Sequence, residues 1–582
     1  MAVLHQYDYL FAIGTIFAFF DAYFLGANDV ANSWATSVSA RSLTYVQAMC
    51  LAAVMELAGC IGVGGHVAST IKNNIVDVDA FAGAPALLML GMVCTVVSSS
   101  VWLGIATKIG FPVSTTHTVM GGIVGFGIAA VGPENVKWIA KGSGVEAING
   151  GVVSVFASWL IAPCLAACFA SILFIITKYL VLLRKDPVKR AFFLLPFYFG
   201  MTASLITALL LTKGGSIKST LGEQVNAAII VAVGAGVAIL VAVFWLPWLW
   251  RVIVMKDWQL SYVHIPLGPL LLRRGEVPPP PEGSEKIIRD YYADHLTLEE
   301  LQAKRAAAGT DAANADPENT MVPVPINPGD ESAANEKLSP APAPVPSPPR
   351  KSLIGPKPAG SNLSPRVLFW WLKWALLQGV DLDIVQLQKN KQDRLAGDLE
   401  MAHAGAAHYN NDVEHMYRFL QMMTAATASF THGANDAANA VGPFSTIYAI
   451  WSSGELSGAK TDVPLWILGF LGSAMIIGLW TYGHKIMVNL GNRITLISPT
   501  RGFSCELGST ITIIVATRFG LPISTTQCIT GATVGVGLCN GSWRTINFRM
   551  VAWIYFGWIV TVPCAGLISG LLMAIIINAP RW

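Results

Sequence analysis

The stretch GANDVAN, residues 26–32, occurs again as GANDAAN at residues 433–439, and the two copies are identical at six of seven positions. A second motif follows each copy: TKIGFPVSTTHTVMGGIVGFG at 107–127 and TRFGLPISTTQCITGATVGVG at 517–537, identical at 10 of 21 positions. From the first motif to the second there are 81 residues in one half and 84 in the other. The chain is therefore an internal duplication.

Between these motifs the chain is strongly apolar. Of its 582 residues, 53% are hydrophobic and 13% are charged, against about 25% charged residues in ordinary soluble domains. Apolar runs long enough to span a bilayer, about 20 residues each, recur about twelve times, and several are broken by Gly and Pro. They predict an all-α integral membrane protein with about twelve transmembrane segments. The net charge of +3 is too small to suggest a nucleic-acid partner.

The polarity of the sequence divides the chain into three parts. Residues 1–250 form a first membrane half, 418–582 a shorter second half, and 251–417 a polar insert with Pro278 to Pro281 in a row. Such composition predicts a largely disordered loop, apart from a helix at 284–307 and an aromatic interfacial helix at 367–378. The clusters of Lys and Arg favour a cytoplasmic loop, with both termini outside.

In this scheme the first Gly-Ala-Asn-Asp (GAND) motif, residues 26–29, ends a helix that enters the membrane from outside. The second, residues 433–436, ends a helix that enters from inside. The two halves are therefore expected to be inverted repeats with broken helices. Many secondary transporters have this architecture and bind their substrate near the midplane, where the repeats meet. A duplicated fold need not transport, but polar residues at the breaks favour transport.

The GAND motifs carry candidate cation ligands. Asp29 and Asp436 end apolar helices, where an ionised carboxylate is costly unless it is paired or coordinated. Each lies among amides that add oxygen ligands: Asn28, Asn32, Asn435 and Asn439. Such a set suits sodium, with a proton on the aspartate as the rival. The competing structural interpretation is that these residues only cap helices.

The Ser-Thr-Thr runs predict an anion site. Pro112 and Pro522 precede them and suit the start of a helix. A helix start offers free N–H groups and partial positive charge, and three hydroxyls add donors. Two facing copies could surround a tetrahedral oxyanion with Ser114, Thr115, Thr116, Ser524, Thr525 and Thr526. Ordinary Ser/Thr capping stays open for either copy alone.

Two further acids, Glu56 and Glu506, lie in apolar stretches. Each could take part in gating or coupling, or could be a structural carboxylate whose hydrogen bonds are satisfied; both interpretations stay open. His117 follows the first Ser-Thr-Thr where the second copy has Gln527, and His432 precedes the second GAND. Packing histidines with hydrogen bonds are the simpler interpretation of both.

The paired GAND and Pro-(Val/Ile)-Ser-Thr-Thr motifs closely resemble those of the inorganic phosphate transporter (PiT) family, and within it the fungal high-affinity sodium-coupled phosphate permeases. The resemblance covers 1–250 and 418–582. It implies a plasma-membrane symporter that imports phosphate with sodium by alternating access, with phosphate at the Ser-Thr-Thr runs and sodium at the Asn/Asp residues. It also implies that Glu56 and Glu506 matter. Gln527 departs from the family pattern, in which His is usual.

Other readings remain open from the sequence. Two intramembrane aspartates could form a protease dyad, but the matched amides and hydroxyls do not require it, and we expect no enzyme activity and no cofactor. A nutrient sensor on the same fold, and sulfate in place of phosphate, stay as alternatives. Homodimerisation, regulatory partners of the loop, and the choice between sodium and proton coupling are not decided by the sequence.

Overall fold

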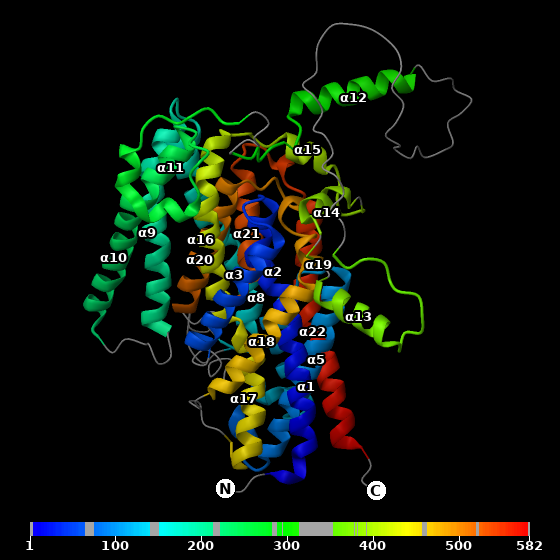
Figure 1. Cartoon of the computed structure of the whole chain (residues 1–582). Helices are drawn as coiled ribbons and strands as arrows, with labels where there is room; N and C mark the ends of the chain where they lie inside the picture. Colours follow the sequence, from blue (N-terminus) through cyan, green and yellow to red (C-terminus); the bar gives the residue numbers. More distant parts are fainter. Residues whose placement is uncertain are drawn as a thin grey trace.

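The computed structural model describes residues 4–64, 75–139, 150–213, 221–281, 288–293, 295–313, 353–377, 379–380, 382–391, 393–456, 463–518 and 523–579. The described chain is helical, as expected, and its one isolated β-bridge joins Val76 to Val136. Within it, eight helices are long and apolar enough to cross a membrane. The two termini lie together at one end of the molecule, opposite the polar insert (Figure 1).

The first GAND motif interrupts a long helix without ending it. Helix α1 (Asp8–Leu25) is followed by a single π-helical turn, η2 (Gly26–Val30), and then by α2 (Ala31–Ser39). A π turn frees backbone groups from the regular ladder and often marks a functional site. Helix α3 (Tyr45–Gly59) then returns toward the end that carries the termini (Figure 1).

The second motif of the first half forms the tip of a helical hairpin. Helix α5 (Pro85–Ile109) and α6 (Thr115–Val131) are joined by a buried turn. Their outer ends lie together, because Lys137 donates its backbone N–H to the carbonyl of Ile75 at 2.8 Å. The hairpin therefore enters and leaves at the same end of the molecule.

The first half also contains one further long helix and a peripheral pair of helices. Helix α8 (Gly151–Thr177) crosses back, and a peripheral pair follows that packs closely at Gly200 and Gly234. This pair consists of α9 (Pro187–Lys213) and α10 (Glu223–Leu240), which continues through a π turn into α11 (Leu246–Ile253).

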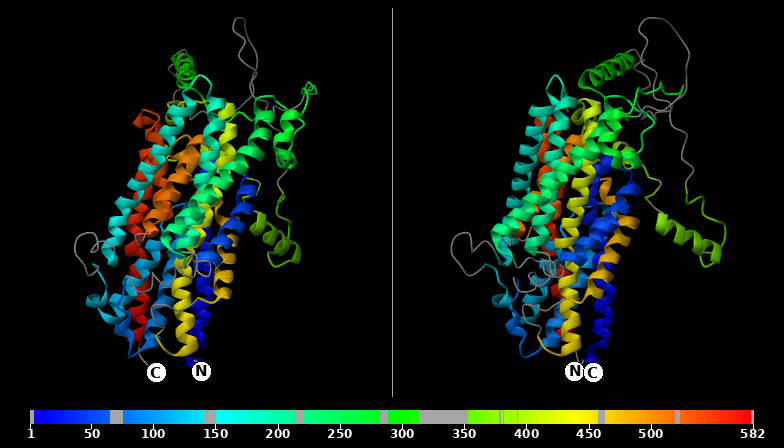
Figure 2. Two further views of the ribbon diagram at one scale, coloured as in Figure 1. Left: turned by 90° about the vertical axis from the view of Figure 1, so that its left-hand side faces the viewer. Right: turned by 60° about the vertical axis from the view of Figure 1, so that its left-hand side comes forward.

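The second half repeats this order upside down. Its elements are α16 (Asn411–Asn435), α17 (Ala437–Ser453), α18 (Leu465–Tyr482), α19 (His484–Met487), α20 (Pro499–Arg518), α21 (Thr525–Leu538) and α22 (Phe548–Asn578). Helix α1 lies in the part near the termini with α2 beyond it, whereas α16 lies in the far part and α17 near the termini (Figures 1 and 2). The expected inversion of broken helices is confirmed.

The hairpin α20–α21 is the inverted counterpart of α5–α6. Its outer ends are joined by Arg501, near the start of α20, which donates to the Asn540 side-chain oxygen at 2.9 Å. The two hairpin tips meet in the interior, where the Thr526 hydroxyl donates to the Val113 carbonyl at 3.3 Å. Hairpins that enter from opposite ends and touch cannot each span the molecule. The apolar runs at 112–131 and 522–540 are thus return arms rather than the full crossings expected of them; Leu521 and Pro522 fall outside the described residues.

Each GAND glycine packs against the equivalent helix of the other half. A Cβ at Gly26 would lie 1.9 Å from the carbonyl oxygen of Met475 on α18, and one at Gly433 would lie 2.3 Å from that of Glu56 on α3. Only glycine fits so close an approach. The reciprocal contact brings the two helix breaks to the interface between the repeats.

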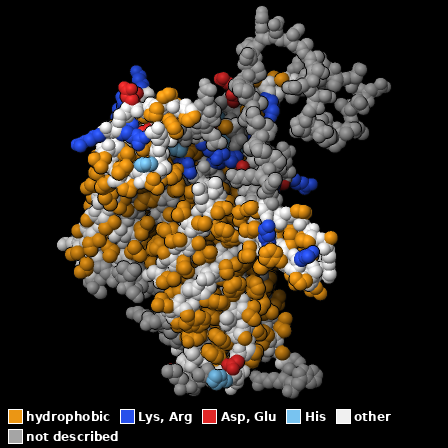
Figure 3. Space-filling view, in the orientation of Figure 1, with side chains coloured by type: hydrophobic (Ala, Val, Ile, Leu, Met, Phe, Trp, Pro, Cys, Tyr) orange, Lys and Arg blue, Asp and Glu red, His pale blue; other side chains and the backbone are white. Residues whose placement is uncertain are grey.

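Most described helices of the polar insert are packed on the body: η9 (Tyr262–Arg273), α13 (Pro365–Leu377), α14 (Ile384–Asn390) and α15 (Leu399–Ala404). Helix α12 (Leu298–Ala313) contacts α15, where Arg305 pairs with Asp398, and projects beyond the body (Figure 1). The helix expected at 284–307 thus begins only at Leu298. The aromatic helix expected at 367–378 corresponds to α13. Hydrophobic side chains cover the flank of the body, and blue basic side chains gather toward the end with the insert (Figure 3).

Candidate functional site

The two helix breaks exchange hydrogen bonds with the hairpin tip of the opposite repeat. Asn32 donates to the Thr526 hydroxyl at 2.7 Å. Reciprocally, Asn439 donates to the hydroxyls of Thr115 at 3.1 Å and Thr116 at 3.0 Å. These residues lie almost 500 or more than 300 positions apart in the chain, so only the inverted fold brings them together. The predicted cation and anion sites are therefore neighbours.

Asp29 lies at the centre of this contact and is 1% exposed. One carboxylate oxygen accepts from the Thr115 hydroxyl at 2.7 Å and from its backbone N–H at 3.3 Å. The other accepts from the Thr526 hydroxyl at 3.2 Å. Asp29 thus joins both hairpin tips, one at the start of α6 and one at the start of α21.

Asn28 holds the first hairpin in place. Its amide donates to the Thr107 hydroxyl at 3.1 Å and the Phe111 carbonyl at 3.0 Å, and its oxygen accepts from the Val113 N–H at 3.1 Å. All three partners lie in the last turn of α5 or in the turn that follows it, so this amide shapes the tip. Asn28, which the sequence predicts as a cation ligand, therefore also has a structural role in the first hairpin.

The second break is arranged differently. Asn435 is only partly buried and donates to the Thr431 carbonyl of its own helix at 3.0 Å. Asp436 is 4% exposed, and its Oδ2 has no hydrogen-bond partner among the described residues. His432 Nε2 lies 3.6 Å from that oxygen. The two motif copies are alike in sequence, but their aspartates have different surroundings.

The Ser-Thr-Thr runs start helices, as predicted. Ser114 precedes α6 and accepts from the His117 N–H at 3.3 Å. Ser524 precedes α21 and its side chain makes no capping bond. The Thr525 hydroxyl and both polar atoms of Gln527 are buried without a partner in the described chain. The second helix start therefore has more free hydrogen-bonding capacity than the first.

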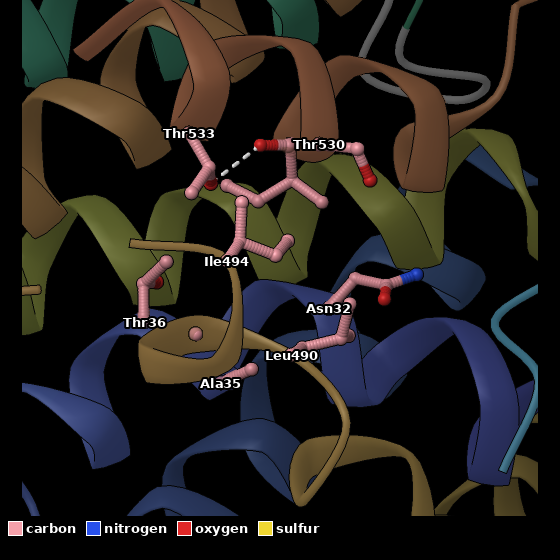
Figure 4. A pocket seen from close by; sticks show the side chains of 9 residues that line it. Asn32, Ala35, Thr36, Leu490, Ile494, Thr530 and Thr533 are labelled. Carbon is pink, nitrogen blue, oxygen red and sulfur yellow. Dashed lines mark hydrogen bonds between the residues drawn. The ribbon is translucent and has the colours of Figure 1, made fainter. Parts of the chain in front are cut away.

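A small space lies beside this contact, between α2, α21 and residues 490–494 (Figure 4). Asn32 and Thr530 line it, and the Asn32 oxygen and the Thr530 hydroxyl have no described partner. It lies on the side of the site toward the polar insert. Sequence patterns alone did not indicate Thr530, because it lies inside the second motif but the first copy has Met120 at the equivalent position.

Glu56 belongs to a buried hydrogen-bonded chain. Its carboxylate accepts from the Ser429 hydroxyl at 2.7 Å and pairs with His432 Nδ1 at 2.8 Å. The Trp34 indole donates to Ser429 at 3.1 Å. Through the two nitrogens of His432, Glu56 is connected to Asp436. His432 is thus a bridge between an acid and the second break, and its sequence position alone did not indicate this.

Glu506 is held by four side-chain donors from two helices. Its Oε1 accepts from Thr36 at 2.6 Å, Ser37 at 2.7 Å and Gln421 at 3.2 Å, and its Oε2 accepts from Thr424 at 2.6 Å. A carboxylate with this many donors is well compensated. Glu506 links α2 of the first repeat to α16 and α20 of the second, at the same level as the small cavity.

Residues 25–569 match the phosphate transporter family (PHO4). The chain belongs to this family. It is 58% identical to the phosphate-repressible phosphate permease pho-4 of Neurospora crassa, over 100% of this chain and 99% of that protein. It is 28% identical to sodium-dependent phosphate transporter 2 of Felis catus, over 98% of both chains. The family consists of transporters, not enzymes.

A solved structure, described as the sodium-dependent phosphate transporter, has the same fold. Its TM-score with this chain is 0.63 at 23% identity, and the alignment covers 98% of this chain and 100% of that one. At this identity the likeness concerns the fold alone. The family resemblance inferred from the GAND and Ser-Thr-Thr motifs is confirmed.

Proposed function

We propose that this protein imports inorganic phosphate together with sodium across the plasma membrane, by alternating access at the site where the two repeats meet. One observation carries the proposal: the buried Asp29 bridges the starts of both half-helices, through Thr115 and Thr526. Relatives named as phosphate permeases and sodium-dependent phosphate transporters support both substrates.

In this proposal the helix starts bind the anion. The free N–H groups of α6 and α21 and the hydroxyls of Ser114, Thr115, Thr116, Ser524, Thr525 and Thr526 donate to phosphate oxygens. Partial positive charge at both starts favours an anion. The unpartnered hydroxyl of Thr525 is available for this without breaking an existing bond.

The carboxylates explain why a cation has to accompany phosphate. An anion about 6 Å from a carboxylate is repelled by roughly 3 kcal/mol at an effective dielectric constant near 20. Sodium ions bound by Asp29 and Asp436, with oxygens of Asn28, Asn32, Asn435 and Asn439, cancel this repulsion. Phosphate then binds well only after sodium, and the loaded carrier reorients.

Glu56 and Glu506 have different tasks in this scheme. Glu56 acts on the second cation site through His432, which lies between it and Asp436. Glu506 joins α2 to α16 and α20 and holds the repeats together on the side of the polar insert. That side is the cytoplasmic one, because its basic residues favour the inside of the membrane.

Uptake into liposomes tests the proposal. Purified protein is given a sodium gradient or a proton gradient separately, and labelled phosphate is counted with and without excess sulfate. We expect sodium-driven accumulation that sulfate does not inhibit. Accumulation driven only by protons excludes sodium as the coupling ion, and inhibition by sulfate excludes selectivity for phosphate.

Substitution of the aspartates separates the cation site from the fold. Asp29→Asn and Asp436→Asn keep the size of the side chain and remove the charge, so we expect loss of at least tenfold in sodium-stimulated uptake. Asp79→Asn, on a short helix near the terminal end, is the control and should behave like the unaltered protein. Full uptake with unchanged sodium dependence in both aspartate variants would contradict the proposed role.

A further inference from the structure

One more buried acid lies in the membrane part, outside the motifs. Asp21 is on α1, eight positions before Asp29, and is 1% exposed. Neither of its carboxyl oxygens has a hydrogen-bond partner among the described residues. In contrast, Asp29, Glu56 and Glu506 all accept hydrogen bonds. Asp21 is thus the acid whose charge the described surroundings compensate least.

The polar group that faces Asp21 is Ser99 on α5. Its hydroxyl is buried and also has no described partner. The other hydroxyls of this part of α5 donate to backbone carbonyls of their own helix: Thr95 to Gly91, Ser98 to Thr95 and Ser100 to Val97. Ser99 is therefore the one hydroxyl of this run that is free to interact with the carboxyl group.

No basic side chain of the long helices that pack on α1, which are α5, α17 and α18, forms a described ion pair with Asp21. Their titratable side chains are Cys94, Lys108, Tyr448 and Tyr482, and none of them forms a described ion pair or hydrogen bond with Asp21. The short turns at the two ends of α1 add His5, Tyr7 and Asp29, and none of these forms a described ion pair or hydrogen bond with Asp21. Lys108 lies in the last turn of α5, nine residues beyond Ser99. The carboxyl group is thus enclosed by largely apolar helices.

An ionised carboxylate in such surroundings is costly, because no opposite charge or hydrogen-bond donor replaces its hydration. A bound cation would need several oxygens, but α1 and α5 are regular helices here and their carbonyls are engaged in helical bonds. The carboxyl and Ser99 oxygens alone are too few to surround a sodium ion. A proton needs only one acceptor atom.

We propose that Asp21 is a proton-binding site, occupied in this conformation, with the Ser99 hydroxyl as its neighbour across the α1–α5 interface. The site lies about 12 Å along the helix axis from Asp29, on the side toward the termini. It is separate from the two sodium sites of the proposed function. If reorientation of the carrier admits water to this interface, the proton is exchanged there and transport becomes sensitive to pH.

Infrared spectroscopy of the purified full-length protein tests proton occupancy without relying on transport. We expect a carbonyl band of a protonated carboxylic acid near neutral pH that disappears in Asp21→Asn. Asp8→Asn removes an exposed acid of the same helix and should keep the band. If Asp21→Asn instead removes a carboxylate band, Asp21 is ionised and the proposal is wrong.

Ser99→Ala keeps the Asp21 carboxyl group. It gives a second infrared test, which can be used if the Asp21→Asn protein does not accumulate in the membrane. Loss of the neighbouring hydroxyl should shift the frequency of the carbonyl band, since that frequency depends on hydrogen bonding. An unchanged spectrum would contradict the pairing of Ser99 with Asp21.

Measurement of phosphate uptake gives a further test, which rests on the proposed function. Uptake by Asp21→Asn is divided by uptake of the unaltered protein at each pH, so that changes in phosphate ionisation cancel. Asn resembles the protonated acid, so the ratio should stay within twofold of one at low pH and move severalfold away from one as the pH rises. A ratio independent of pH, or one fewer bound sodium ion in Asp21→Asn, would overturn the proton assignment. If the unaltered protein moves no phosphate, the proposed function fails while the infrared result still stands.

Discussion

At the scale of single residues, the site depends on side chains that serve both repeats at once. Thr526 is the clearest case. Its hydroxyl accepts from Asn32 and has two acceptors within reach of its single hydrogen, Asp29 and the Val113 carbonyl. One hydroxyl thus connects the first helix break, the tip of the first hairpin and the start of α21.

Thr526→Val should lower phosphate uptake by roughly tenfold to a hundredfold, because it removes bonds to a charged group that contribute about 1.5–3 kcal/mol. The side chains are nearly the same size, so the packing is preserved. Thr526→Ser retains the hydroxyl and should recover most of the activity. Initial rates at saturating sodium give the comparison, and equal rates for Val and Ser would show that the hydroxyl is not needed.

Glu506→Gln tests the role of the four donors around that carboxylate. An amide has one acceptor oxygen, so its NH₂ group would face donors, and a buried donor left unsatisfied costs about 1–3 kcal/mol. We expect a lower melting temperature of the purified protein as well as slower uptake. Glu276→Gln, at an exposed position, is the control. Slower uptake with an unchanged melting temperature would point to direct coupling instead of support.

At the scale of elements, the second arm of each hairpin packs against a helix of the other repeat: α6 packs against α22, and α21 packs against α8. On α6, a Cβ at Gly121 or Gly125 would lie 2.6 Å or 2.0 Å from carbonyl oxygens of Val562 and Gly566 on α22. On α21, Gly531 and Gly535 approach the carbonyls of Pro163 and Ala167 on α8 in the same way, at 2.2 Å and 2.6 Å. Small residues four apart allow such close packing in membranes.

Gly125→Ala should therefore displace α6 from α22 and reduce both folded protein and phosphate uptake, since the methyl group meets backbone. Gly236→Ala is the matched control, because this helical glycine has nothing within 4 Å of an added Cβ. There the substitution should be neutral, or stabilising by about 0.5–1 kcal/mol through helix propensity. Yield after detergent extraction and thermal unfolding measure the difference. Similar behaviour of both variants would rule out the close packing as the cause.

At the scale of the whole molecule, the polar insert closes the body at the end opposite the termini. Gln388 of α14 is 1% exposed and donates to Ser39 and to the carbonyls of Met487 and Leu490. Asp393 pairs with the buried Arg493. His403 donates from Nε2 to the Asn492 carbonyl at 2.6 Å. The described residues 382–391 and 393–407 are therefore docked where α2 and residues 487–493 meet, next to the small cavity.

This docking should weaken in acid. Burial lowers the pKa of His403 to about 4, whereas a solvated histidine titrates near about 6.5. The neutral docked form is therefore favoured above pH 6.5, and its advantage is lost as the pH falls toward 4, by roughly 2 kcal/mol at pH 5. The protection factors of the α15 amides, in which the intrinsic exchange rate at each pH is divided out, should be lower at pH 5 than at pH 7.5. His403→Gln should remove this difference and His5→Gln, which is exposed, should not; a pH effect that survives His403→Gln would assign it to another group.

The sequence alone determined the fold class, the duplication, its inversion and the residues at the breaks, because these depend on local patterns. Apolar runs predict spanning helices, and two matched motifs in opposite orientations predict an inverted repeat. It also placed the residues now found at the tips, since Pro-x-Ser-Thr-Thr suits the start of a helix. Contacts such as Asn32 with Thr526 are consistent with the expectation that the cation and anion residues share one site.

The tertiary structure decided how the two copies of the GAND motif differ. Nearly identical sequences give Asp29 three hydrogen bonds and leave an oxygen of Asp436 beside His432 without one. It also decided that the hairpins stop in the interior, that Glu56 reaches His432, and that Asp21 faces Ser99. These relations join residues that are distant in sequence, and apolar periodicity does not encode which helices become neighbours. The repeated Gly-Ala-Asn-Asp motif thus determined which residues form the breaks, and the packing of one repeat on the other determined what each of them contacts.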